Sequence, residues 1–250
     1  MAKSLKRLLN ATTNLVASIS FTANAFAAPT VTVSVGGQNY NVTYTTTSYN
    51  ASTSLLQSQP CWGSISSATS FATAVEWRLF YPNTDPNTLA GPYFVYSYSP
   101  FVNFMFDYGG FIGGGAVNPT GDFAYATATS NISSGTTTNA TALIGNPTLS
   151  GGTLVMNETN GAYSQNFTVS NATTSIIDQD GNTSTFTGIF SGGGNLVISN
   201  TGSSGKVIFT GANTYTGTTT ITSYKRRRES VPLNRFNLAS KGGAKVYRSC

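Results

Sequence analysis

Residues 151–223 repeat a short pattern, and this repeat constrains the fold more than any other feature of the chain. Gly152–Val155 (GTLV) returns as Gly194–Ile198 (GNLVI), and Thr187-Gly188 returns 23 residues later as Thr210-Gly211. Short apolar strands alternate with turns of Gly, Asn and Ser. A repeat of about 20–25 residues is typical of a solenoid, whose coils each bury an inward apolar row against their neighbours. The pattern predicts a β-solenoid over these residues.

The scarcity of charge supports a mainly β chain. Only 8% of the residues are charged, whereas about 25% is usual in soluble domains. A long exposed helix needs charge on its outer face, while Thr, Tyr, Phe and Val suit strands and Gly and Asn suit turns. With 39% apolar and 12% aromatic residues, the chain has enough to bury, which argues against disorder.

The positive net charge of +5 comes from the two ends of the chain. Between Pro29 and Ser223 there are two basic residues, Arg78 and Lys206, and seven acidic ones, so the net charge of this stretch is −5. A nucleic-acid groove needs clustered cations. We therefore expect no nucleic-acid partner.

Residues 1–28 have the three parts of a secretory signal peptide. Three cations precede a short apolar run, which ends in Ala25-Phe26-Ala27. We expect cleavage after Ala27 or Ala28 and a secreted or bacterial cell-surface location, periplasmic if translocation is incomplete; the alternative is an N-terminal helix of a cytosolic protein. No other run approaches the ~20 apolar residues of a membrane-spanning helix. Cys61 and Cys250 are expected to be unpaired.

Residues 29–128 are predicted to form an aromatic-rich β domain with one helix. Alternating apolar residues on either side of Gly36-Gly37 predict a hairpin over 30–46. Apolar residues at spacings of three and four predict a helix over about 66–80, ended by Pro82.

Nine Tyr and Phe residues follow one another closely between Tyr93 and Phe111. Such a cluster is more often core than a ligand platform, and the alternative is glycan stacking on Trp62, Trp77, Tyr93 or Tyr96. The pieces Gln59–Gly63, Phe71–Val75 and Gly91–Tyr96 resemble a segment near the start of some secreted cyanobacterial and marine bacterial proteins. That resemblance implies a domain and no particular activity.

Residues 129–150 are rich in Ser and Thr and are expected to be a linker or weak strands. Beyond them, Gly205–Ile221 (GKVIFTGANTYTGTTTI), preceded by Ile177–Asn182 and Gly188–Leu196, resembles the autotransporter-associated β-strand repeat over residues 176–222. The resemblance implies a surface or secreted passenger built as a parallel β-helix, so we expect residues 151–223 to form an incomplete right-handed parallel β-solenoid. Members usually carry many more coils and a C-terminal membrane β-barrel, so we expect this chain to be a fragment of such a passenger.

The repeat stops abruptly at Thr222. Residues 224–250 contain eight cations, among them Lys225–Arg228, and one acid, Glu229. Three explanations stay open for this tail, which is predicted to be disordered: a truncated or frameshifted reading frame, a flexible basic tail that binds acidic polymer or membrane, and a basic localisation patch.

No arrangement of residues predicts catalysis, a cofactor or a metal. The chain has no His, the commonest general base, and Asp178-Gln-Asp180-Gly-Asn182 lacks the Gly and Glu positions of a calcium loop. An enzyme would need Glu76, Asp107 and Asp122 to converge. We therefore expect a non-enzymatic structural or adhesive surface protein that contacts a glycan, host or abiotic surface; the alternative is a small carbohydrate-binding module on a solenoid stalk.

Overall fold

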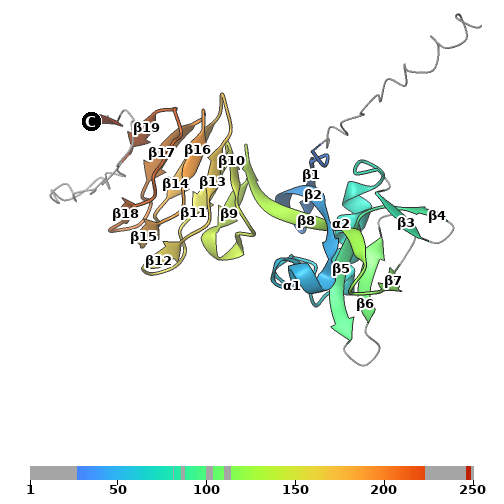
Figure 1. The fold of residues 1–250 in the computed structure, drawn as a ribbon. Coiled ribbons are helices and arrows are strands. Elements are labelled where there is room, and N and C mark those ends of the chain that lie inside the picture. The colour runs from blue at the N-terminus through green and yellow to red at the C-terminus, as the bar shows by residue number, and fades with distance from the viewer. Residues whose placement is uncertain are drawn as a thin grey trace, which may run out of the picture.

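The computed structural model has two parts that share one long strand (Figure 1). One part is a sheet with two helices, and the other is a parallel β-solenoid of about three turns. The described residues are 27–80, 82–85, 88–99, 104–109, 114–222 and 246–248. The predicted signal peptide lies outside them except for its last two residues.

The predicted hairpin is confirmed. Strands β1 (Val31–Val35) and β2 (Gln38–Ser48) pair antiparallel, and Gly36 and Gly37 between them have φ of 58° and 78°. Two positive φ values in a two-residue loop are the geometry that matches the twist of a hairpin and that favours Gly. On its other side β2 pairs antiparallel with β8 (Asp122–Ser133), from Ser48↔Asp122 to Tyr40↔Ser130.

The sheet continues beyond β8 through three further strands. These are β5 (Tyr93–Ser99), β6 (Phe104–Gly109) and β7 (Gly114–Val117), and they form an antiparallel meander. Strand β5 meets β8 in parallel at a single pair, Tyr93↔Tyr125. Strands β3 (Asn83–Asp85) and β4 (Thr88–Ala90) form a separate small hairpin.

The predicted helix is present as α2 (Ile65–Val75), and it ends earlier than the spacing of apolar residues indicates. Ser64 caps its start by accepting a hydrogen bond from the Ser67 amide at 3.2 Å. The chain leaves the helix at Glu76, whose φ is 53°, and Leu79 is buried in the turn that follows.

A second helix, α1 (Tyr49–Gln57), is a correction to the one-helix prediction. It begins where β2 ends, and the Ser48 side chain accepts a hydrogen bond from the Ala51 amide at 3.3 Å. Only Tyr49 and Leu56 of this helix are buried. Two apolar contacts in nine residues are too few to produce a recognisable helical stripe.

In the solenoid, each complete coil contributes one strand to each of three sheets, and the strands of successive coils pair in parallel. The first coil contains β10 (Thr148–Ser150), β11 (Thr153–Val155) and β12 (Gly161–Tyr163). The second contains β13 (Phe167–Val169), β14 (Thr174–Asp178) and β15 (Thr183–Phe186). The third contains β16 (Phe190–Gly192), β17 (Asn195–Ser199) and β18 (Lys206–Phe209).

The register confirms the predicted period and corrects the alignment of the repeats. Thr148 pairs with Thr168 and Gly161 with Ser184, which are offsets of 20 and 23 residues. The sequence places Leu154 against Leu196, but the structure pairs Leu154 with Ile177 and Ile177 with Ile198. A shift of two residues leaves the inward face unchanged, because side chains alternate with a period of two.

Rows of apolar side chains fill the solenoid interior. Leu154, Ile177 and Ile198 form one row and are fully buried. Phe186 stacks between Tyr163 and Phe209, with ring centroids 5.2 Å away on each side. Each fully buried large apolar side chain contributes roughly 1.5–3 kcal/mol, so this column is a main source of stability.

Further strands flank the three coils. The end of β8 and β9 (Thr137–Asn139) precede them, a 3₁₀ turn over Ala140–Ala142 follows β9, and β19 (Thr219–Ile221) comes after them. The segment 129–150, for which linker and weak strand were both open, thus contains β9 and β10. Strand β20 (Val246–Arg248) lies in the tail that is predicted to be disordered, and it pairs in parallel with β19. The rest of that tail lies outside the described residues. Over the described part of the chain, neither helix is long and apolar enough to cross a membrane.

Candidate binding surface

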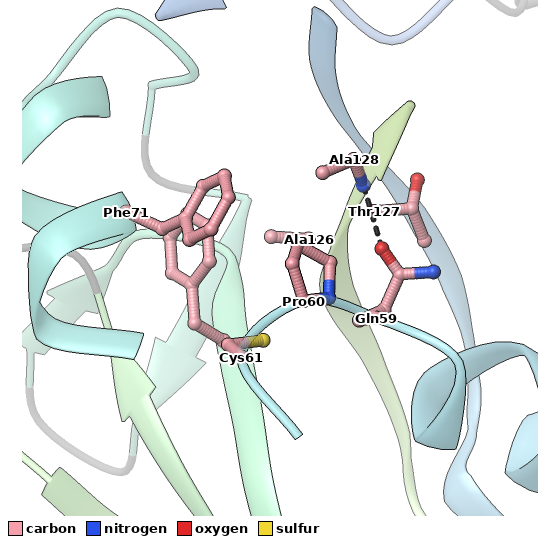
Figure 2. Close-up of a pocket in the computed structure, with 8 residues that line it drawn as sticks. Gln59, Pro60, Cys61, Phe71, Ala126, Thr127 and Ala128 are labelled. Atoms are coloured by element: carbon pink, nitrogen blue, oxygen red, sulfur yellow. Dashed lines mark hydrogen bonds between the residues drawn. The ribbon is translucent and has the colours of Figure 1, made fainter. Parts of the chain in front are cut away.

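The segment Gln59–Gly63 joins two strands that diverge. Beyond the single pair between β5 and β8, the Gln59 side chain accepts a hydrogen bond from the Ala128 amide of β8 at 2.7 Å (Figure 2). On the other side, the Cys61 thiol donates to the Val95 carbonyl at 3.2 Å and the Gly63 amide donates to the Tyr96 carbonyl at 2.7 Å. The segment therefore replaces a missing stretch of sheet.

Pro60 and Cys61 face Phe71 and Ala126 across a closely packed space (Figure 2). The space is too small for a water molecule, so it is core and cannot hold a ligand. Burial raises the pKa of the Cys61 thiol to about 12, because a thiolate loses its hydration there. The pieces Gln59–Gly63, Phe71–Val75 and Gly91–Tyr96 all contribute to this one buried cluster, which includes Cys61, Phe71 and Phe94.

The Asn83 side chain forms hydrogen bonds with backbone groups of β8 at Ala124. Its side chain accepts from the Ala124 amide at 2.7 Å and donates to the carbonyls of Ala124 and Gly91 at 3.0 and 2.9 Å. The residue is only 4% exposed. Three hydrogen bonds from one buried amide make Asn83 a structural residue, which composition alone does not single out.

Two of the four candidate glycan-stacking residues, Trp62 and Tyr93, lie on the same face of the sheet. Trp62 is half-buried and stacks on Tyr49 at 6.3 Å, and Tyr49 stacks on Tyr98 at 5.0 Å. Tyr93 is only 6% exposed and packs against Phe123 and Tyr125. Trp62 is therefore partly open to solvent, whereas Tyr93 is part of the core.

Tyr96 and Trp77 lie apart from that face. Tyr96 is half-buried against the cluster under α2, because residues on β5 alternate between the two faces of the sheet. Trp77 is 59% exposed in the turn after α2, and Phe80 in the same turn is 62% exposed. The four candidates therefore do not form one platform. The helix predicted over 66–80 ends before residue 80, so the sequence did not indicate that Phe80 is an exposed aromatic residue in the same turn as Trp77.

The three acidic residues that an enzyme would need to bring together lie on different elements. Glu76 lies in the turn after α2 and Asp122 begins β8 opposite Ser48, while Asp107 pairs with Gly115 in β6 and β7. Among the described residues no group of three or more His, Cys, Asp or Glu side chains could hold a metal ion.

Asp178 joins the turn between β14 and β15 to the next coil. Its carboxylate accepts from the Asp180 amide at 3.1 Å, and from the Thr201 amide and hydroxyl at 2.9 and 2.7 Å. Thr201 belongs to the next coil. These bonds agree with the interpretation of the Asp178–Asn182 segment as a turn between strands.

Asparagine side chains tie successive coils together at the corners of the solenoid. Asn146 accepts from the Asn166 amide at 3.0 Å, and Asn166 accepts from the Ile189 amide of the next coil at 2.8 Å. Asn171 and Asn195 accept in the same way from Gly193 and Thr218 at 2.8 Å. The abundant Asn of the sequence thus satisfies backbone donors where the strands end.

No family model, curated protein or solved structure matches the chain. In the described residues, a solenoid whose coils are joined by asparagine side chains carries a domain with two exposed aromatic rings on one turn.

Proposed function

We propose that this chain is an exported structural or adhesive protein of a bacterial surface, a fragment of an autotransporter-like passenger, without catalytic activity. The observation that supports it is the parallel solenoid itself, whose coils are joined by backbone hydrogen bonds and asparagine side chains with little use of charge. Such a stack grows by adding coils and displays whatever its end carries. Here its end carries the domain built on β8.

Export is tested first, by expressing the full chain with a C-terminal epitope in a Gram-negative bacterium. We expect the mature protein to begin at Ala28 or Pro29 by N-terminal sequencing. We also expect it in the medium or on the cell surface, where added protease digests it in intact cells. Recovery of the chain in the cytoplasm with Met1 still in place contradicts the proposal.

The control for export changes only the signal region. Replacing Ala25 and Ala27 by Arg removes the small residues of the cleavage site, and the precursor should then accumulate uncleaved. Thr185→Ala, on the outer face of β15, serves as the matched variant that leaves processing unchanged.

The second candidate function is a small carbohydrate-binding module carried on the solenoid. It is favoured by the two exposed rings of Trp77 and Phe80, because most other described aromatic side chains are buried or half-buried. A glycan array probed with the full chain tests it directly, and the absence of any bound glycan argues against it.

A further inference from the structure

The turn Glu76–Phe80 holds two aromatic rings toward solvent on a firmly anchored backbone. The Phe80 amide donates to the Trp77 carbonyl at 2.9 Å, which closes a tight turn. In such a turn the first and fourth Cα atoms lie within about 7 Å, so the two side chains start from neighbouring positions. Both are more than half exposed, at 59% and 62%.

The residues between the two rings fix the turn from below. Leu79 is fully buried in the cluster under α2. The Arg78 guanidinium donates to the carbonyls of Thr32, Val75 and Ala74. The buried Leu79 side chain and the hydrogen bonds of Arg78 to β1 and α2 therefore hold the turn in one conformation.

Two residues of this turn, Glu76 and Phe80 itself, have a strained backbone. Their φ angles are 53° and 59°, and residues other than Gly adopt such positive values at a cost of about 1–3 kcal/mol. A chain that only needed to leave the helix could do so with Gly. Here the strained conformation leaves Trp77 and Phe80 outside the core.

The charge around the turn restricts the partner. Arg78 is the only basic residue between Pro29 and Gly205, and its guanidinium is occupied by carbonyl oxygens. Next to Trp77, the Glu76 carboxylate is exposed as well. An anionic lipid surface or an acidic polymer needs accessible cations, so the surroundings disfavour both.

We propose that the turn Glu76–Phe80 is a binding site for a neutral polysaccharide, with Trp77 and Phe80 stacking on sugar rings and the Glu76 carboxylate accepting hydrogen bonds from sugar hydroxyls. Flat aromatic faces match the C–H faces of pyranose rings, and a carboxylate is a strong acceptor for hydroxyl donors. The inference rests on the second candidate function and gives that function its ligand class and residues.

The test uses the full chain and three variants: Trp77→Ala, Trp77→Ala/Phe80→Ala, and Leu55→Ala as the matched control. Leu55 is another exposed apolar residue of the same domain, at 44%. The probes are cellulose particles, chitin particles and a soluble neutral β-glucan. Phosphatidylcholine vesicles, with and without phosphatidylglycerol, are measured in parallel. Melting temperatures of all variants should stay unchanged, since the truncated side chains are exposed.

We expect retention on at least one neutral polysaccharide, a loss of affinity of about tenfold in the double variant, and no loss in Leu55→Ala. Retention that survives in the double variant, or no retention on any of the three polysaccharides, overturns the inference. Vesicle binding that the double variant loses, without polysaccharide binding, also overturns it and assigns the turn to membranes. Export is measured separately, so polysaccharide binding by a chain that is not exported would refute the leading proposed function alone.

Discussion

Phe186 occupies the centre of the aromatic core of the solenoid, and replacing it should be among the most damaging single changes there. Its ring packs against Tyr163, Phe167, Phe190 and Phe209, with centroid distances from 5.2 to 5.5 Å. The side chain is completely buried. Because these partners come from all three complete coils, the loss of the ring leaves a cavity that no single coil can close.

The expected cost follows from the cavity. Phe→Ala in a core costs about 3–5 kcal/mol, and the value rises with the volume that stays empty. Native domains have only about 5–15 kcal/mol of stability in total. For a chain of this size the melting temperature falls by about 2–4 °C per kcal/mol, so we expect Phe186→Ala to melt roughly 6–20 °C lower.

Far-UV circular dichroism of thermal and urea unfolding measures this change. Trp62 and Trp77 both lie in the other part of the molecule, so tryptophan fluorescence reports that part separately and should shift less. The control is Thr185→Ala, one residue earlier on the outer face of β15, which should change stability by less than about 0.5 kcal/mol. Equal melting temperatures for the two variants would refute the packing described for the solenoid core.

Three further outcomes follow from the hydrogen bonds and from Cys61. Asn166→Ala removes the acceptor of the Ile189 amide and should cost about 1 kcal/mol in urea unfolding, against the same threonine control; no change would mean that water replaces the bond. Asn83→Leu leaves the Ala124 backbone groups unpaired in the core and should cost about 2–4 kcal/mol in unfolding followed by tryptophan fluorescence, whereas wild-type stability would contradict the role given to Asn83. The raised pKa of Cys61, about 12, means that the folded state keeps its proton while the unfolded thiol loses it above about pH 8.5. The stability from Cys61 should therefore be complete below that pH and decline as the pH rises toward 12, with Cys61→Ala lacking that part of the decline in unfolding measured at several pH values.

The solenoid could be predicted from sequence because its physical requirements recur in every coil. Each coil needs inward apolar residues such as Ile177 and Ile198 and turns that relieve strand ends. The register between coils could not be predicted, because Leu196 and Ile198 are both apolar and point to the same side, so either could be the partner of Ile177. Only the stacking of turns of unequal length, 20 residues in one coil and 23 in the next, selects between them.

The aromatic domain was less readable because distant segments complete its sheet. The insertion of Gln59–Gly63 between β5 and β8 and the amide of Asn83 depend on contacts across many residues of sequence. The end of α2 was missed because Leu79 extends the helical spacing while packing from a turn. That misplacement is why Phe80 was not recognised beside Trp77.

Strand β8 runs from the sheet of the aromatic domain into the first turn of the solenoid, and this has a mechanical consequence. Ser48↔Asp122 pairs at one end of it and Ser150↔Ser133 at the other, with no flexible hinge between. A pull on the displayed domain is then borne as shear along a row of hydrogen bonds that must break together, whereas a hinge would let them peel apart one after another. A surface protein built in this way would withstand the drag of flowing liquid. It would transmit that force without damping to the attachment at the other end of the solenoid.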